Sequence, residues 1–260
     1  MKGVSPKNIV RTAYEDPKVV ARYNEKGIWK SEEILLRRFF PKEGDVLDLG
    51  CGAGRTSVCL AQMGYRVTGI DLSPEMVRVA EMEADRLGLK IDFRAMDARE
   101  LNFPDQSFDA ALFSFNGLDH VSGYGAKLEI FLQVFRVLKP GAPFIFSAHR
   151  IWSPVHLPKL IAGGLKLSLG KLLGFKTMEK EWGEIYDLRA TDLEERYSHF
   201  LSSGRWKKAL GAAGFHIDSC ESVFQLESHR PRRLLRSLRS GNLIYYVSSN
   251  FMFYVARKPE

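Results

Sequence analysis

The stretch from Asp45 to His149 alternates short apolar runs with longer segments in which apolar residues recur at helical spacing. The apolar runs predict buried strands at residues 46–49, 66–70, 91–95, 108–115 and 143–148. Between them, apolar residues return every three or four positions, as on the buried face of an amphipathic helix. This alternation is typical of β-α-β units, so the sequence predicts an α/β fold built on a mostly parallel sheet.

Two helix boundaries are marked by specific residues. Ser73 followed by Pro74 joins a preferred N-cap to a residue suited to the first helical position, so we expect a helix to begin there. The expected helix over residues 127–138 is followed by Pro140 and Gly141, a combination that ends helices.

The pattern changes after Arg150. Residues 151–201 contain an apolar stretch broken by proline and glycine and then alternating residues, and we interpret them as a cap inserted after the fifth strand. The chain thus divides into an N-terminal helical segment, the first half of the α/β domain, the cap or substrate region, and a C-terminal part that completes the domain, at residues 1–44, 45–150, 151–201 and 202–260.

Composition is that of an ordinary soluble chain, with 45% apolar and 27% charged residues in 260. The apolar runs are too short to span a bilayer, and the first residues lack the apolar stretch of a signal peptide, so the expected compartment is the cytoplasm. The three cysteines lack the spacing of a disulfide framework or a metal site, and we predict no metal.

The net charge of +7 is concentrated in two segments, 150–178 and 228–240, each with five basic residues and no acidic one. Such segments suggest contact with a membrane surface or another anionic partner. For residues 157–175, a mobile amphipathic lid and a helix pair packed on the domain are both open. A solvated amphipathic helix would also explain the arginines of 228–240.

A glycine-rich turn, Gly50-Cys51-Gly52-Ala53-Gly54, follows the first strand. Glycines between a strand and a helix let a ligand approach the backbone closely. Arg55 stands after the third glycine, so the dinucleotide fingerprint is not matched, and no phosphate-binding Gly-Lys-Ser/Thr follows. Cys51 is either a nucleophile or simply a small residue at a tight bend.

Three carboxylates stand at three strand ends beside this turn: Asp48, Asp71 and Asp97. An acidic residue after the second strand is suited to bridge ribose hydroxyls. Carboxylates would repel a pyrophosphate, so the set favours a cationic nucleoside.

These motifs, together with Phe108-Asp109 opening the fourth strand and Leu138 to Gly141, resemble class I S-adenosylmethionine-dependent methyltransferases over residues 45–150. The resemblance implies a Rossmann-like, seven-stranded, mostly parallel sheet with the last strand antiparallel and helices on both faces. It also implies S-adenosylmethionine as cofactor, with S-adenosylhomocysteine as product, bound by residues 45–150.

The resemblance assigns cofactor contacts position by position. The glycines would cradle the methionyl part near Asp48, Asp71 would hold the ribose, and adenine would lie against the third-strand end. The residues so assigned are Tyr23, Asp48, Gly50, Cys51, Gly52, Gly54, Asp71, Leu72, Met76, Asp97, Ala98, Phe115 and Asn116. Tyr14 and Tyr23 match tyrosines that close over the cofactor in relatives, or are packed aromatic residues.

Methyl transfer from a sulfonium is an in-line displacement, so a base is needed only if the acceptor must lose a proton. His120 and His149 are the candidate bases, and His120 has a structural capping role as its alternative. Ser114 to Gly117 lacks the prolines of nucleic-acid amino methyltransferases. We therefore expect a small-molecule acceptor, lipid-like or anionic, at oxygen, nitrogen or carbon. RNA methylation and cofactor binding without transfer are the alternatives, and a nicotinamide-dependent reductase is remote. The oligomeric state is not predicted.

Overall fold

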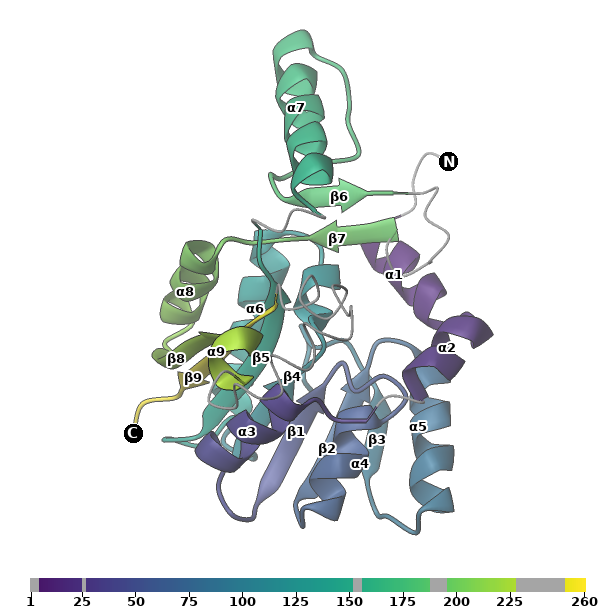
Figure 1. Cartoon of the computed structure of the whole chain (residues 1–260), viewed down its shortest axis with the longest axis vertical. Helices are drawn as coiled ribbons and strands as arrows, with labels where there is room; N and C mark the ends of the chain where they lie inside the picture. The colour runs from purple at the N-terminus through teal and green to yellow at the C-terminus, as the bar shows by residue number, and fades with distance from the viewer. Residues whose placement is uncertain (1–4, 25–26, 152–155, 188–195, 228–250) are drawn as a thin grey trace, which may run out of the picture.

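The computed structural model describes residues 5–24, 27–151, 156–187, 196–227 and 251–260, and its centre is a seven-stranded sheet (Figure 1). Its strands run in the order β3-β2-β1-β4-β5-β9-β8. They are β1 (Asp45–Leu49), β2 (Arg66–Asp71), β3 (Asp92–Ala95), β4 (Ala110–Phe113), β5 (Pro143–His149), β8 (His216–Ser222) and β9 (Phe251–Arg257). The first five are parallel, and β9 is antiparallel to both β5 and β8. The predicted sheet is confirmed.

The helices connect and cover these strands. They are α1 (Pro6–Tyr14), α2 (Pro17–Asn24), α3 (Lys30–Phe39), α4 (Arg55–Gln62), α5 (Pro74–Arg86), α6 (Tyr124–Val137), α7 (Leu157–Leu173), α8 (Ser203–Ala212) and α9 (Val223–Glu227), with a 3-10 turn, η1 (Gly117–His120). The start of α5 is as predicted, because the Ser73 hydroxyl accepts a hydrogen bond from the Met76 amide at 3.2 Å.

Alternate residues of the central strands enter two separate apolar layers, as the two-residue period of a strand requires. On one face, Leu47 and Phe146 pack with Phe131 of α6 and Trp206 of α8. On the other face, residues such as Val46 pack against α3 and α4. Both faces are covered, which is why the strands read as continuous apolar runs.

The carboxyl ends of β1 to β5 meet at one edge of the sheet, since these strands are parallel. The strand order reverses between β1 and β4, and ligands of open α/β sheets bind at such a switch point.

Within its described residues, the N-terminal segment of residues 1–44 forms three helices, α1, α2 and α3. The break between α1 and α2 falls at Glu15 and Asp16, directly before Pro17, where the residue preceding a proline is disfavoured in the helical conformation. Because of these breaks, α1 turns toward the upper edge of the sheet, whereas α3 lies against its face (Figure 1).

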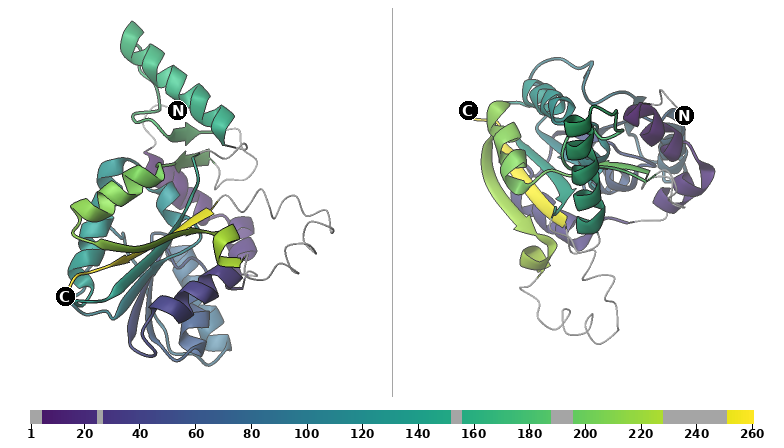
Figure 2. Two further views of the ribbon diagram at one scale, coloured as in Figure 1. Left: turned by 60° about the vertical axis from the view of Figure 1, so that its left-hand side comes forward. Right: turned by 90° about the horizontal axis from the view of Figure 1, so that it is seen from above.

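The cap consists of α7 and a separate two-stranded antiparallel sheet, β6 (Glu184–Tyr186) and β7 (Tyr197–His199). It stands beyond the carboxyl edge of the main sheet, and α7 extends farthest from the body (Figures 1 and 2). The described part of 157–175 is one helix, not a helix pair. The basic run 228–240 lies outside the described residues. Within the described ranges, none of the helices combines the length and apolar character that a membrane span requires.

Candidate functional site

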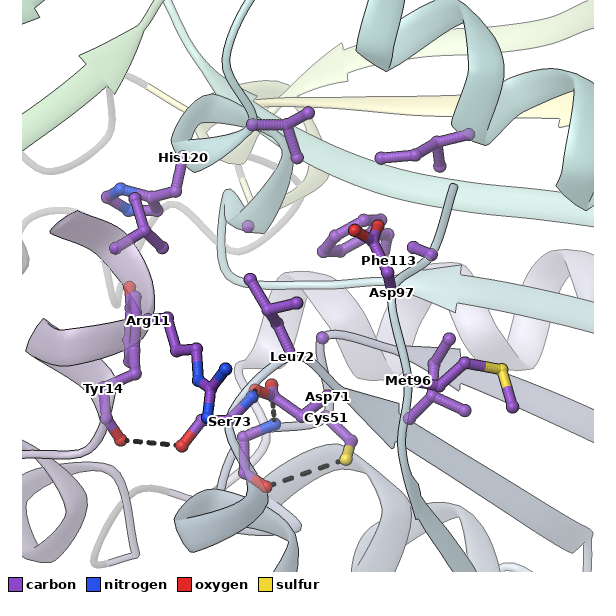
Figure 3. Close-up of a pocket in the computed structure, with 18 of the residues that line it drawn as sticks. Arg11, Tyr14, Cys51, Asp71, Leu72, Ser73, Met96, Asp97, Phe113 and His120 are labelled. Carbon is purple, nitrogen blue, oxygen red and sulfur yellow. Dashed lines mark hydrogen bonds between the residues drawn. The ribbon is translucent and has the colours of Figure 1, made fainter. Parts of the chain in front are cut away.

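A pocket opens at the switch point, between the carboxyl edge of the sheet and α1 (Figure 3). Its walls come from α1, the turn after β1, the ends of β2, β3 and β4, η1 and the start of α6. The residues predicted from the sequence that line it are Tyr14, Gly50, Cys51, Gly52, Asp71, Leu72, Asp97, Ala98, Phe115 and His120. The structure thus brings together residues that are far apart in the chain.

The glycine turn forms the floor of this pocket, and two of its glycines have left-handed backbone angles, with φ of 60° at Gly50 and 55° at Gly52. A Cβ atom on Gly50 would lie 2.6 Å from a ring carbon of Phe113, whereas one on Gly52 would meet nothing within 4 Å. Gly52 therefore offers bare backbone to a ligand. Burial raises the pKa of the Cys51 thiol well above its usual value, which keeps it protonated and disfavours the nucleophile interpretation.

Asp71 lies at the end of β2 and is oriented by the backbone around it. One carboxylate oxygen accepts a hydrogen bond from the Gly52 amide and the other from the Ser73 amide, both at 2.9 Å. Each oxygen has two lone pairs, so both retain capacity to accept a hydroxyl from a ligand. Burial raises the pKa of this carboxyl, and the amide hydrogen bonds oppose the shift.

Asp97, after β3, is held by two cations. Lys7 of α1 contacts one of its oxygens at 2.6 Å, and Arg99 contacts the same oxygen at 2.7 Å. Burial opposes ionisation, but these hydrogen bonds hold the pKa of Asp97 well below its usual value. The Lys7 contact ties α1 across the pocket, and nothing in the sequence signalled it.

Five other predicted residues are not among those lining the pocket: Asp48, Gly54, Met76, Asn116 and His149. Asp48 is fully buried, and one of its oxygens accepts the hydroxyls of Thr56 and Ser57, both at 2.6 Å, because the side chain turns toward the first turn of α4. Burial raises its pKa to about 6. Met76 is buried beside Val19 and Val20, since the first turn of α5 packs it against the N-terminal helices.

Two more of these residues serve the backbone. Gly54 is the left-handed residue directly before α4, and Asn116 is the left-handed residue directly before η1. Tyr23 is part of α2, but its side chain lies outside what the structure describes.

His120 lies in the pocket opposite the glycine turn, with its ring 5.8 Å from that of Tyr14 (Figure 3). Its Nδ1 is 3.1 Å from the carbonyl oxygen of Tyr197 in the cap. A carbonyl only accepts, so Nδ1 carries the proton and, in the neutral ring, Nε2 carries the lone pair. Burial lowers the pKa of His120, which favours this neutral form.

A buried lysine holds the turn that carries His120. Lys127 of α6 has no exposed surface, and its ammonium donates to the carbonyls of Leu118 and Val121. Burial lowers its pKa to about 7. The turn is therefore fixed from within the protein, and no sequence pattern indicated this role of Lys127.

His149 ends β5 on the other side of η1. Its Nδ1 and its backbone amide both lie 2.8 Å from one oxygen of Asp119, which has no exposed surface. The ring packs against Phe251 and Phe200, with centroids 4.6 and 5.2 Å away. His149 is thus oriented by a carboxylate, but it does not line the pocket that contains His120.

Arg55 takes part in a buried ion pair that supports the pocket wall. Its guanidinium donates to both oxygens of Glu32 in α3, at 2.7 and 2.8 Å, and to Ser114 at 2.9 Å. The Arg55 and Glu32 side chains are only 6% and 1% exposed. This bidentate pair joins α3, α4 and the end of β4, and the arginine also lies over the Phe115 ring at 5.1 Å.

Sequence reasoning missed Lys7, Val10 and Arg11 of α1, all of which line the pocket. The signal available was weak: Ser5 followed by Pro6 marks a helix start, and its hydroxyl accepts from the Asn8 amide. That signal predicts the helix but not its place over the pocket.

Comparison with known proteins agrees with this geometry. Residues 46–141 match the family model described as a methyltransferase domain. The chain is 39% identical over 109 residues to a putative methyltransferase, YqeM, of Bacillus subtilis, a match covering 42% of this chain and 44% of the relative. It is 33% identical over 115 residues to a ubiquinone biosynthesis O-methyltransferase of Xanthomonas axonopodis pv. citri, covering 44% of this chain and 47% of the relative.

A solved structure of an S-adenosylmethionine-dependent methyltransferase from Methanosarcina mazei superposes with a TM-score of 0.63 at 27% identity, covering 90% of this chain and 99% of that one. Residues 46–141 therefore form a methyltransferase domain, and the chain has the class I S-adenosylmethionine-dependent methyltransferase fold. The chain spans less than half the length of the two curated relatives above.

The residues present fit S-adenosylmethionine, the cofactor of this class. Asp71 keeps lone pairs free for ribose hydroxyls, and the backbone at Gly52 is open to a ligand. Of the two lining carboxylates, Asp97 is already paired with Lys7 and Arg99, which leaves Asp71 as the one that can accept ligand hydroxyls.

Proposed function

We propose that this chain transfers a methyl group from S-adenosylmethionine to a small-molecule acceptor, with His120 as the general base. One observation carries the proposal: a single pocket joins the glycine turn, Asp71 and Asp97 to a neutral histidine whose Nδ1 is already engaged. The cofactor would supply an activated methyl group on a positively charged sulfur. The protein's own residues would bind the cofactor, align it with the acceptor and take a proton from the acceptor.

The residue roles follow from position. Gly50 and Gly52 would hold the methionyl part, Asp71 would accept the ribose hydroxyls, and Asp97 with the Ala98 backbone would read the adenine edge beside Leu72. The residues Asp48, Gly54, Met76 and Asn116 would act one layer behind, by shaping the turn and the helix starts around it. Tyr14 and Phe115 would enclose the bound ligands.

For the acceptor, we propose a lipid-like small molecule with an ionisable hydroxyl. Two features support this choice. The Nε2 atom of neutral His120 is suited to take a hydroxyl proton during the displacement. One relative is named as an O-methyltransferase of ubiquinone biosynthesis, which supports an oxygen atom as the methyl acceptor.

Titration calorimetry with S-adenosylmethionine and S-adenosylhomocysteine tests the cofactor part. We expect both to bind, and Asp71→Ala to weaken binding at least tenfold, about 1.4 kcal/mol, because two hydroxyl contacts would be lost. Asp92→Ala is the matched control, since Asp92 is an aspartate of the neighbouring β3 that pairs with Arg94 on the surface. Failure of the folded protein to bind either ligand would remove the proposal.

A transfer assay with phenolic and catechol acceptors of increasing apolar chain length tests the acceptor part. We expect methyl transfer that improves with chain length. A different result would identify a cofactor-binding protein without transferase activity. It is tight cofactor binding that His120 substitution leaves unchanged, with no methyl transfer to any acceptor.

A further inference from the structure

The cap helix α7 leaves much of its apolar surface uncovered. Its buried positions are Leu160, Gly163, Leu167 and Gly170, whereas the large side chains of Leu165, Leu169 and Leu172 are 59%, 47% and 79% exposed. An ordinary surface helix buries its large apolar residues on one face and exposes polar residues on the other. The outward face of α7 therefore contributes little to holding the cap on the protein.

Close backbone approach explains which face is buried. A Cβ atom on Gly163 would lie 3.0 Å from the carbonyl oxygen of Glu184, and one on Gly170 would lie 2.7 Å from the Thr177 side chain. The segment that returns from α7 to β6 thus occupies the glycine side of the helix. The exposed leucines could not take the positions of these glycines, because side chains larger than glycine would clash with the returning segment.

The exposed apolar residues form a stripe. Ile161, Leu165, Leu169 and Leu172 are spaced by four, four and three residues, which places them on one side of a helix. Among the described residues, every exposed large apolar side chain lies within 161–182, apart from Met82, Leu87 and Leu132. A patch so concentrated on one protruding element marks an interaction surface. The left view of Figure 2 shows that α7 extends clear of the body.

Charge indicates what the stripe contacts. Residues 157–178 contain Lys159, Lys166, Lys171 and Lys176 and no acidic residue. Lys159 pairs with Asp187, but no ion pair within the described ranges involves the other three lysines, all of which are exposed. An apolar stripe flanked by lysines complements a surface with an apolar interior and anionic groups at its boundary.

We propose that α7 docks this protein on the surface of an anionic lipid bilayer, with the Ile161 to Leu172 stripe in the interface and the lysines against lipid phosphates. The helix would lie in the interface plane, without crossing the bilayer. Because β7 contacts both η1 and α1, the docked cap would hold the pocket close to lipid-dissolved compounds.

The test is flotation of the full chain with vesicles of phosphatidylcholine, alone or mixed with phosphatidylglycerol. The double variant Leu165→Ser/Leu169→Ser should lose roughly a hundredfold in partitioning. Met82→Ser/Leu132→Ser is the matched control, since these residues of α5 and α6 have the same exposed fractions, 59% and 47%. It should bind like the unmodified chain. Lys166→Gln and Lys171→Gln should each weaken binding roughly fivefold, and only to the anionic vesicles.

Two results would overturn the proposal. One is absence of binding to the anionic vesicles by the unmodified chain, or equal binding by the leucine variant. The other is a dimer in sedimentation that the leucine variant converts to a monomer without any vesicle binding, which would assign the stripe to a second copy. The flotation uses no cofactor or acceptor, so its result is separate from the proposed methyl transfer.

Discussion

The carboxyl edge of the sheet and the cap helix α7 use glycine and large apolar residues in opposite ways. At the edge, Gly50 and Gly52 line the pocket, and large residues such as Phe113 and Met76 are buried beside or behind the turn. In α7, Gly163 and Gly170 face the protein, and Leu165, Leu169 and Leu172 face outward. The edge is therefore built to hold a ligand inside the protein, and the helix is built to present an apolar surface outside it.

The largest expected effect is at His120, which lies at the carboxyl edge and whose Nδ1 contacts Tyr197 of β7 in the cap. In His120→Asn the side-chain amide keeps a donor near the Nδ1 position but removes the basic Nε2. We expect methyl transfer to a hydroxyl acceptor to fall by about 10² to 10⁴-fold, with little change in cofactor affinity by calorimetry. His216→Asn, at an exposed histidine of β8, is the control.

The pH dependence of the same reaction sharpens this assignment. A base must be unprotonated, and burial lowers the pKa of His120 below its ordinary value of 6.5. The rate should therefore be constant above that pH and fall only on further acidification, and this limb should disappear in His120→Asn. A limb centred well above pH 6.5 in the unmodified chain would assign the base elsewhere.

The next largest effect concerns the pocket wall. Glu32→Gln leaves Arg55 buried without its carboxylate partner, and we expect a loss of about 3–5 kcal/mol in the free energy of unfolding, measured by urea denaturation. Glu75→Gln breaks the exposed pair with Arg78 and should leave the midpoint unchanged. Equal effects of the two substitutions would mean that burial of the Glu32–Arg55 pair does not increase its contribution to the free energy of unfolding.

A smaller effect separates two glycines of the turn. Both have left-handed φ values, so Gly52→Ala should cost about 1–2 kcal/mol of stability. Gly50→Ala should cost roughly 1–3 kcal/mol more, because its Cβ would overlap the Phe113 ring. Thermal denaturation measures both, and similar costs would show that the ring moves aside freely.

The smallest effect is expected in α7. Leu165→Ser should change the unfolding free energy by no more than about 0.5 kcal/mol, because the side chain is already in water. Leu167→Ser, two residues along and 9% exposed, should cost roughly 2 kcal/mol or more. A large loss from Leu165→Ser would mean that the stripe is covered by the protein itself.

The sequence alone determined the alternation of strands and helices over residues 45–149, the starts of α5 and of the glycine turn, and the acidic residues Asp71 and Asp97 at the strand ends. These features depend on the two periods of regular structure and on residues that cap or bend the chain locally. The alternation of strands and helices also determined the fold class, because β-α-β units build a parallel sheet, and the carboxyl ends of its strands meet at one edge.

Only the tertiary structure decided which side of the edge each residue faces. It turned Asp48 toward Thr56 and Ser57, brought Lys7 to Asp97 across 90 positions of sequence, and set the proton of His120 on Nδ1 through Tyr197. It also turned Leu165, Leu169 and Leu172 of α7 outward. The Lys7 and His120 contacts join segments 90 and 77 positions apart in the chain, and local pattern carries no information about such contacts.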